Sequence, residues 1–379
     1  MNPILPGKTI GILGGGQLGR MLSFEAKRMG YKVITLDPDP DSPCGQVSDD
    51  QIIARFDDTD AMMHLGERCD VVTYEFENIN HLSVEALEQK GKRVCPNSAV
   101  LRTTQNRLLE KEFLTRMRIP VTQFMEVNST SSLGEASAAI GFPAVLKTIS
   151  HGYDGKGQWI VQTMAEAESA FKEAKGFSLI WEKIIHFAKE LGIICVRNEA
   201  GEIVTYPVTE NIHKENILDL SIIPARISPD TAQRAKAIAT SIAEALQFVG
   251  TFCVEMFLLP NGDVLVNEIA PRPHNSGHYT IDACVTSQFE QQLRAICNLP
   301  LGSSKLISRA VMANILGSGS GNTLTGFDAL LKDSAAHLHL YGKKHAAAKR
   351  KMGHVTFLGD SVDALLEKAQ AMREELAWK

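Results

Sequence analysis

The chain of 379 residues lacks the features that mark several large classes of protein. Its seven cysteines form no CxxC pair and are odd in number, which argues against a disulfide framework or a zinc site and favours reduced thiols. No run of about 18 apolar residues occurs, and the first residues lack a basic leader with an apolar core, so we expect neither membrane insertion nor export. The net charge of -5 gives no electrostatic reason to expect nucleic acid or a membrane as partner. We therefore expect a cytoplasmic protein.

The composition and length predict a globular chain of two or three domains, with 44% apolar and 22% charged residues. Alternating strand and helix patterns over residues 1–105 predict an open parallel α/β sheet of Rossmann-like type. A helix then ends at Ile119-Pro120, and the elements of residues 120–185 are small, which indicates an α+β lid. Longer strands and a long helix complete a central domain over residues 106–298. Residues 299–379 alternate short strands with a Gly-Ser segment and end in a helix, so we predict a small C-terminal domain.

Residues 252–274 predict a β-hairpin that sets two carboxylates side by side. Asn261-Gly262 is the pair favoured in a two-residue hairpin turn, and that turn fixes a register in which Glu255 lies directly opposite Glu268. Like charges roughly 5 Å apart are unfavourable unless a cation lies between them. Carboxylate oxygens at this spacing suit Mg²⁺, which commonly binds one or two carboxylates and substrate phosphates. The hairpin therefore indicates a nucleotide-using enzyme, and the alternative is a solvent-facing hairpin with two weakly repelling glutamates.

A glycine-rich turn, Gly14-x-Gly16-x-x-Gly19, follows the first predicted strand and opens a helix, with Asp37 at the end of the next strand. This arrangement matches the dinucleotide fingerprint in form. Backbone N–H groups at a helix start bind any phosphate, however, so a ribose phosphate is an equally good ligand. We interpret the turn as a phosphate site, and NAD binding or a purely structural turn remain alternatives.

A second glycine-rich segment, residues 151–158, follows a strand that ends near Lys147. Three glycines in six residues suit a loop that closes over phosphates and presents its N–H groups to them, and Lys147 would neutralise phosphate charge. Downstream, Glu182 lies on a strand suited to meet an adenine edge, and Glu190 could hold ribose hydroxyls. The alternative is a flexible hairpin loop beside an exposed lysine.

Cationic residues follow the hairpin and recur in the tail. Arg272 lies in a proline-stiffened segment, where it could stabilise charge that develops on a transferring phosphate, or simply satisfy a loop carbonyl. His274 and His278 we interpret as structural, since no third ligand follows at zinc spacing. The tail carries a cluster that could bind an anionic substrate or could be solvated surface: Lys343, Lys344, Lys349, Arg350 and Lys351.

The motifs together resemble those of one ATP-grasp family, the N5-carboxyaminoimidazole ribonucleotide synthetases of purine biosynthesis. The resemblance rests on GILGGGQLGRM, YEFEN, GYDGKGQ, NEIAPRPHNSGH and YGK, which occur in the family's order and span almost the whole chain. It implies a Rossmann-like N-terminal domain, a central ATP-grasp domain with a lid, and a small C-terminal domain. It also implies that ATP phosphorylates bicarbonate to carboxyphosphate, which carboxylates 5-aminoimidazole ribonucleotide. The other ATP-grasp ligases with an acylphosphate intermediate, such as biotin carboxylases and formate-dependent glycinamide ribonucleotide transformylases, are the alternative.

The resemblance also implies site residues and partners. Those implied to contact ATP are Arg107, Lys147, Gly152, Tyr153, Asp154, Gly155, Lys156, Gly157, Gln158, Glu182, Lys183, Ile184, Ile185, Glu190, His213, Asn267 and Glu268. Those implied to contact the ribonucleotide or carboxyphosphate are Gln17, Leu18, Glu75, Tyr153, Asp154, Arg272, Lys343 and Arg350. Among these, Arg272, Asp154 and Lys343 are implied to be catalytic, while Glu255 and Glu268 are implied to hold Mg²⁺. The family further leads us to expect a homodimer.

One position departs from the pattern of many ATP-grasp enzymes in a way that this family shares, and a second departs from the pattern of the family itself. Many ATP-grasp enzymes carry an asparagine two residues after the second metal glutamate, where this chain has Ala270. The tail has Ala347 where the family often has an arginine, which puts in doubt the cation that binds the ribose phosphate. Lys349 is the candidate substitute.

Overall fold

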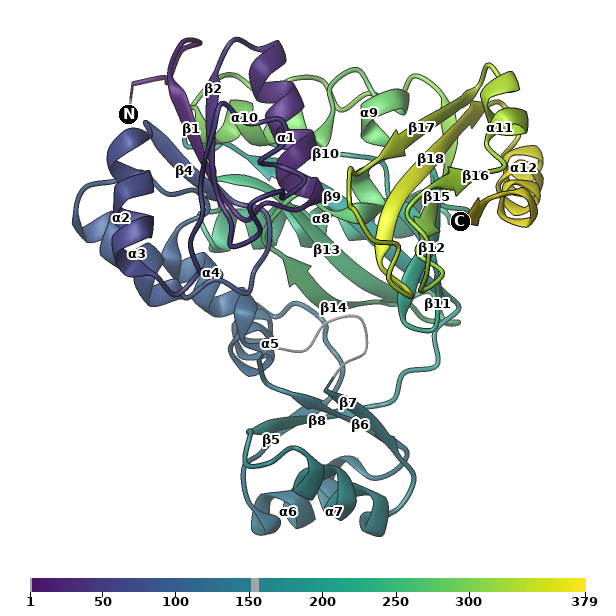
Figure 1. Cartoon of the computed structure of the whole chain (residues 1–379). Helices are drawn as coiled ribbons and strands as arrows, with labels where there is room; N and C mark the ends of the chain where they lie inside the picture. Colours follow the sequence, from purple (N-terminus) through teal and green to yellow (C-terminus); the bar gives the residue numbers. More distant parts are fainter. Residues whose placement is uncertain (1, 151–156) are drawn as a thin grey trace.

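The computed structural model describes residues 2–150 and 157–379, and it begins with the predicted open parallel sheet (Figure 1). Four strands pair in the order β3-β2-β1-β4, all parallel, and helices flank the sheet. Strands β1, β2 and β4 are mostly apolar and buried, as expected for strands covered on both faces, whereas the short edge strand β3 is partly exposed. The elements are β1 (Thr9–Leu13), α1 (Gln17–Arg28), β2 (Lys32–Leu36), β3 (Asp50–Ile52), α2 (Thr59–Arg68), β4 (Val71–Tyr74) and α3 (His81–Gln89).

Two helices, α4 (Ser98–Gln105) and α5 (Arg107–Arg116), lead from this sheet to the predicted lid. Asn97 and Asn106 cap them, since each side chain accepts a hydrogen bond from a backbone N–H of the first turn. The lid is an antiparallel sheet in the order β5-β8-β6-β7, and its two helices cover the face that points away from the rest of the molecule (Figure 1). Its elements are β5 (Phe124–Val127), α6 (Thr130–Ile140), β6 (Ala144–Thr148), β7 (Gln158–Val161), α7 (Met164–Glu173) and β8 (Leu179–Lys183).

A nine-stranded sheet forms the centre, with eight strands in the order β14-β13-β9-β11-β12-β15-β18-β17 and β10 paired to β9. The segment EIVTYPVTEN does not form one continuous strand, because it divides around Pro207 into β10 and β11. The strands are β9 (Lys189–Arg197), β10 (Ile203–Thr205), β11 (Thr209–Lys214), β12 (Ile217–Ile223), β13 (Gly250–Leu258), β14 (Val264–Ala270), β15 (Arg309–Leu316), β17 (Ala336–Leu340) and β18 (Lys351–Gly359). The helices beside it are α8 (Pro229–Ala245), the 3₁₀ turn η1 (Asn275–Gly277), α9 (Thr280–Ala283) and α10 (Gln288–Ile296).

The C-terminal segment shares this sheet, because β15 pairs with β12 of the central segment and with β18. The predicted domain boundary at residue 298 therefore separates strands that belong to one continuous sheet. The remaining elements are β16 (Leu324–Thr325), α11 (Asp328–Lys332), α12 (Val362–Glu375) and β19 (Ala377–Trp378). All seven cysteines are free thiols. Within the described ranges, no helix has the length and apolar character needed to cross a bilayer.

Candidate active site

The hairpin that carries the two glutamates has a three-residue loop, so the predicted two-residue turn is wrong. The Leu259 N–H donates to the Asp263 carbonyl at 2.8 Å, which closes the loop one residue earlier than predicted. Gly262 occupies the left-handed region with φ +89°, as the last position of such a loop requires. Next to the loop, the pairing of β13 and β14 is consequently displaced by one residue.

A β-bulge restores the predicted register. Met256 faces Val266, whereas Glu255, the residue before Met256 on β13, faces Glu268. Asn267 is therefore the additional residue on β14. The prediction that Glu255 and Glu268 face each other is therefore confirmed, although the three-residue loop and the bulge that produce this pairing were not predicted. The bulge also directs Asn267 and Glu268 into the same cavity as Glu255.

The two glutamates differ in their electrostatic surroundings. His274 Nε2 lies 3.1 Å from Glu255 Oε1. Burial alone would raise the pKa of Glu255, but the interaction with His274 is the stronger effect and lowers this pKa to about 2. Desolvation and the negative charge of Glu255 raise the pKa of Glu268. The pKa of His274 rises to about 10, since interactions with Cys253 and Glu255 exceed the effect of burial. A divalent cation beside Glu268 would relieve this repulsion, and the oxygen donors present fit Mg²⁺.

A cavity of about 310 Å³ opens over this pair, where the lid, the N-terminal segment, the central sheet and β18 meet. The predicted site residues that line it are Arg107, Lys147, Gly157, Gln158, Glu190, His213, Glu255, Asn267, Glu268 and Arg272. Lining residues that were not predicted as site residues include Glu77, Gln105, Glu110, Asn216 and Lys351. Lys351 was noted only as part of the tail cluster. The predicted residues Gly152, Tyr153, Asp154, Gly155 and Lys156 lie outside the described residues and stay predictions.

Glu182 is paired with two lysines, and its predicted contact with adenine stays a prediction. Its buried carboxylate accepts a hydrogen bond from Lys147 Nζ at 2.7 Å, and Lys111 Nζ lies 3.5 Å from its other oxygen. Burial alone would raise the pKa of Glu182, but the two ammonium groups lower it to about 2. The side chain therefore holds Lys147 in place at the cavity wall. Ile184 and Ile185 lie in the segment after β8, and their contacts with ATP stay predictions.

Lys183, the last residue of β8, belongs to the hinge of the lid. Its N–H donates to the Gln123 carbonyl at 3.0 Å, and its own carbonyl accepts a hydrogen bond from Thr122 Oγ1 at 2.9 Å. These bonds occupy the N–H of Lys183 and one lone pair of its carbonyl, so a contact with ATP would come from the second lone pair of the carbonyl or from the side chain.

The Glu182 carboxylate should make the free energy of unfolding depend on pH in the acid range. Its folded-state pKa of about 2 lies below the ordinary 4.5, so its interactions stabilise the fold above pH 4.5 and are lost as the pH falls toward 2. We expect Glu182→Gln to lower the free energy of unfolding at pH 7 by roughly 3 kcal/mol, with the difference from wild type narrowing below pH 4.5. Urea unfolding between pH 7 and 3 measures this. The exposed Glu168→Gln in the same lid is the control, and an equal effect of both changes would contradict the assigned role.

On the opposite wall, Glu190 and His213 form a pair. His213 Nδ1 and Glu190 Oε2 lie in direct hydrogen-bond contact, and the pairing of β11 with β12 is irregular between Ile212 and His213. Burial lowers the pKa of His213, but the Glu190 carboxylate outweighs this effect and raises it. Both side chains line the cavity, so the structure brings these two predicted ATP ligands together.

Arg272 is held by a carboxylate that the sequence reasoning missed. Arg272 donates from Nε and from Nη2 to the two oxygens of Glu77, the latter at 3.1 Å. Burial raises the pKa of Glu77, but Arg272 outweighs it, and the net shift is downward. Gln105 fixes the strand end by donating to the carbonyls of Glu77 and Ile79. The alternation of acidic residues in YEFEN was the available signal, but it did not show which carboxylate faces the arginine.

The glycine N–H groups of the turn before α1 donate to protein acceptors. Glu75 accepts hydrogen bonds from the N–H of Gly16 and, at 3.0 Å, from that of Gly19, while Asp37 accepts one from Gly15 at 2.7 Å. A protein carboxylate thus occupies the helix N-terminus where a dinucleotide phosphate would bind. The structure favours the structural alternative for this turn and gives the NAD interpretation no anion site. A contact of Glu75 with substrate stays a prediction.

Lys343 lies near this turn. Its Nζ donates to the Lys351 carbonyl at 2.6 Å, and burial together with the charge of Arg350 lowers the pKa of Lys343 to about 8, against the opposing effect of Glu75. Lys349, the candidate substitute for the missing arginine, pairs instead with Glu215 at 2.6 Å on the surface. The predicted substrate residues Gln17 and Leu18 form the first turn of α1. The predicted cations Lys343 and Arg350 are thus neighbours, although neither belongs to the described lining of the cavity.

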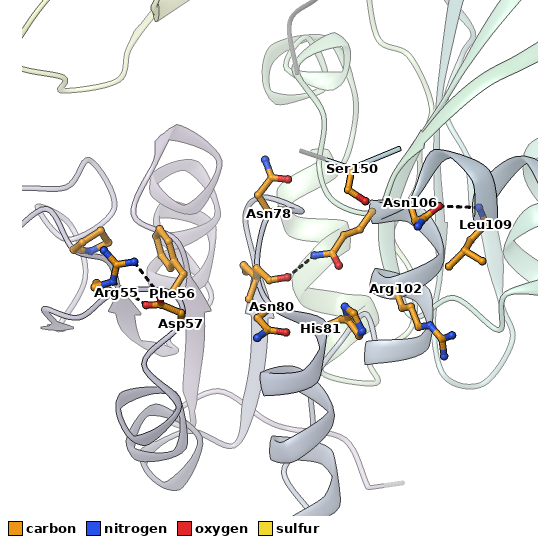
Figure 2. Close-up of a pocket in the computed structure, with 13 residues that line it drawn as sticks. Arg55, Phe56, Asp57, Asn78, Asn80, His81, Arg102, Asn106, Leu109 and Ser150 are labelled. Carbon is orange, nitrogen blue, oxygen red and sulfur yellow. Dashed lines mark hydrogen bonds and ion pairs between the residues drawn. The ribbon is translucent and has the colours of Figure 1, made fainter. Parts of the chain in front are cut away.

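A larger cavity, of about 830 Å³, lies beside the first one and shares Asn78 and Gln105 with it. Figure 2 shows its polar wall, with Asn80 and His81 at the start of α3 and Arg102 on α4. Its described lining contains no pair of facing carboxylates. We therefore assign the chemistry to the smaller cavity.

Comparison with protein families gives three successive matches. Residues 7–105 match the ribonucleotide synthetase preATP-grasp domain, and residues 112–289 match the ATP-grasp domain. Residues 310–368 match the phosphoribosylaminoimidazole carboxylase C-terminal domain.

Whole-chain relatives agree with these matches. The chain is 44% identical to the N5-carboxyaminoimidazole ribonucleotide synthase of Bacillus subtilis, over 96% of this chain and 95% of that one. It resembles the crystal structure of an N5-carboxyaminoimidazole ribonucleotide synthetase in complex with ADP, with a TM-score of 0.92, 48% identity and 98% of each chain covered. It also resembles the Aspergillus clavatus N5-carboxyaminoimidazole synthase in complex with ADP and 5-aminoimidazole ribonucleotide, with a TM-score of 0.90, 34% identity, and 97% of this chain and 98% of that one covered.

Proposed function

Because the chain belongs to the family of N5-carboxyaminoimidazole ribonucleotide synthases, which are ATP-grasp ligases, we propose that the cavity over Glu255 and Glu268 is where it acts. The reaction is the ATP-dependent carboxylation of 5-aminoimidazole ribonucleotide with bicarbonate, a step of purine biosynthesis. The observation that supports this location is the facing pair of carboxylates below the lid, with Lys147 on one wall and Arg272 on another.

The reaction places anionic groups in this cavity at each step. A bicarbonate oxygen attacks the γ-phosphorus of ATP, and the bond to the bridging oxygen breaks to leave ADP and carboxyphosphate. Carboxyphosphate then divides into CO2 and phosphate, and the exocyclic amine of the ribonucleotide bonds to the carbon and loses a proton. Lys147, held by Glu182, and Arg272, held by Glu77, are fixed cations that can stabilise charge on the transferring phosphoryl group.

The residues at the bulge fit a magnesium ion. Glu255, Asn267 and Glu268 offer side-chain oxygens from adjacent positions of one hairpin. Desolvation and the charge of Glu255 raise the pKa of Glu268 despite the nearby Arg107 and Lys147, and a divalent cation would offset both effects. Mg²⁺ bound there would supply neutralisation of the ATP phosphates. Ala270 offers no oxygen from its side chain, so water and phosphate would complete the set of ligands.

The ribonucleotide site lies, in this proposal, between the first turn of α1 and the tail cations. Gln17, Leu18 and Lys343 would contact it, and Lys351, which lines the cavity, is a better-placed additional cation than Lys349. Tyr153 and Asp154 of the lid loop stay predictions, as do the homodimer and the cytoplasmic location.

The test of the proposed function is the dependence of phosphate release on the acceptor. Purified protein with Mg²⁺, ATP and bicarbonate should release phosphate slowly, and 5-aminoimidazole ribonucleotide should accelerate the release at least tenfold, because the amine consumes the intermediate. Replacing bicarbonate by formate, or the acceptor by glycinamide ribonucleotide or biotin, should not restore the rate. A rate unchanged by 5-aminoimidazole ribonucleotide would contradict the proposal.

A further inference from the structure

A group of histidines and one aspartate gathers where α9 meets β17 and β18. His339 and His354 are paired across these strands, and their rings stack with centroids 4.4 Å apart and an interplanar angle of 11°. Asp282 reaches them from α9, with its Oδ2 at 2.9 Å from His339 Nε2. The ligand atoms of these three side chains lie within 4.8 Å of one another, and none of the three is among the described residues that line the ATP cavity.

One imidazole in the group has a nitrogen without a partner. His354 is fully buried; its Nδ1 lies 2.8 Å from the Tyr341 hydroxyl, while its Nε2 has no hydrogen-bond partner among the described residues. The ring of His278 covers it at a centroid distance of 4.8 Å. A buried polar atom without a hydrogen-bond partner is unfavourable, so the Nε2 of His354 is a position where a bound ion would be stabilising.

We propose that Asp282, His339 and His354 form a second metal site, for a divalent transition-metal ion of the zinc class. Two imidazoles and one carboxylate are ligands that Zn²⁺ accepts readily and that Mg²⁺, which prefers oxygen, does not. His337 is a fourth candidate ligand, since its Nδ1 lies 3.5 Å from Asp282 Oδ1. Tyr341, on the other nitrogen of His354, is a partner of the kind that orients a metal-bound imidazole.

A shared ion requires the ring of His339 to rotate out of its stack with His354, because a metal ion lies in the plane of each imidazole that binds it and these two rings are nearly parallel. Ligand atoms about 2.0 Å from one tetrahedral zinc ion lie roughly 3.3 Å apart. Asp282 Oδ2 and His339 Nε2 are already 2.9 Å apart, so His354 is the ligand toward which the other two must move. His339 can supply this movement because its side chain is 26% exposed, whereas His354 is fixed by its packing. The ion would take the place of the hydrogen bond between Asp282 and His339. It would then tie α9 of the central segment to the C-terminal strands, so its expected effect is on stability.

The experiment counts tightly bound ions in the full-length protein. Chelator-treated protein, with the nucleotide cleft saturated by Mg²⁺ and ADP, is equilibrated with Zn²⁺, and bound metal is measured after dialysis. Wild type should bind one tight equivalent and gain several degrees in its unfolding midpoint. Asp282→Asn and His339→Gln should each weaken this binding at least tenfold, whereas the exposed His345→Gln should not.

A measurement without variants separates this site from others. Anomalous diffraction from zinc-soaked wild-type crystals should place the ion between His339 and His354. An ion found only at Glu255 and Glu268 or at cysteine thiols would overturn the proposal, as would equal zinc binding by wild type and His339→Gln. If a variant proves unstable without metal, the diffraction result decides.

Discussion

Replacing Glu268 with glutamine is expected to lower the rate of phosphate release roughly 10²- to 10³-fold, with saturating bicarbonate and 5-aminoimidazole ribonucleotide. Glutamine keeps the shape of the side chain but removes one of the two negative charges that face each other across the hairpin. The remaining Glu255 is already compensated by His274, so the pair can no longer retain a divalent cation with the same affinity. Steady-state phosphate release over a range of Mg²⁺ concentrations measures the loss.

The matched control is Glu244→Gln, the same change on the exposed face of α8. It should leave the rate within twofold of wild type. Binding of ADP without Mg²⁺ should also survive in Glu268→Gln, because Lys147 and Arg107 remain on the cavity walls. A Glu268→Gln enzyme with the wild-type rate would show that the facing carboxylates do not hold the metal that the reaction needs.

The carboxylate pair shows how far sequence reasoning reaches into this site. The alternation of apolar residues predicted the hairpin, and the Asn-Gly pair located its turn within a residue. The predicted register depended on a two-residue loop. The chain instead forms a three-residue loop, which displaces the strand pairing by one residue, and a bulge at Asn267, which reverses that displacement. Both devices depend on packing of the whole sheet. The facing of Glu255 and Glu268 was thus predicted correctly because two local departures cancel.

The order of elements was largely accessible, since strand and helix periods are local properties of the chain. The parallel N-terminal sheet, the lid and a long helix in the central domain were all predicted, and the structure has that helix as α8, which begins at Pro229. The extension of the central sheet by β15, β18 and β17 was not, because strand partners distant in sequence leave no periodic signal. The histidine group on α9, β17 and β18 escaped prediction for the same reason.

Pairs of side chains from distant segments were the least accessible part of the site. Glu182 lies on a strand predicted to meet an adenine edge, but its pairing with Lys147 and Lys111 had no signal in the sequence. Glu75 is implied by the resemblance to contact the substrate, but its hydrogen bonds to the glycine turn were not predicted either. In both cases the residue type was informative, but the partner is set by tertiary contact.

The second large effect is expected at Arg272, whose planar guanidinium is fixed by two hydrogen bonds to Glu77. Arg272→Ala removes a cation from the cavity wall and should lower kcat roughly 10²- to 10³-fold. Arg272→Lys retains the charge but not the two-point contact, so it should recover only part of the rate. Steady-state measurement of phosphate release gives kcat for wild type and for both variants. If kcat of Arg272→Lys equalled that of wild type, the two-point contact of the guanidinium with Glu77 would have no role in catalysis.

Glu77 should act only through Arg272, which a double-mutant cycle can show. Glu77→Gln leaves the arginine charged but less constrained, so kcat should fall about tenfold with little change in the KM for ATP, and the exposed Glu67→Gln is the control. In an Arg272→Ala background, the further change Glu77→Gln should cost almost nothing, because the group that it positions is already absent. Fully additive losses would instead mean that the Glu77 carboxylate contacts a reactant itself. Because the pair joins the N-terminal sheet to the segment after β14, its coupling would also show that catalysis depends on how these two parts of the chain are held together.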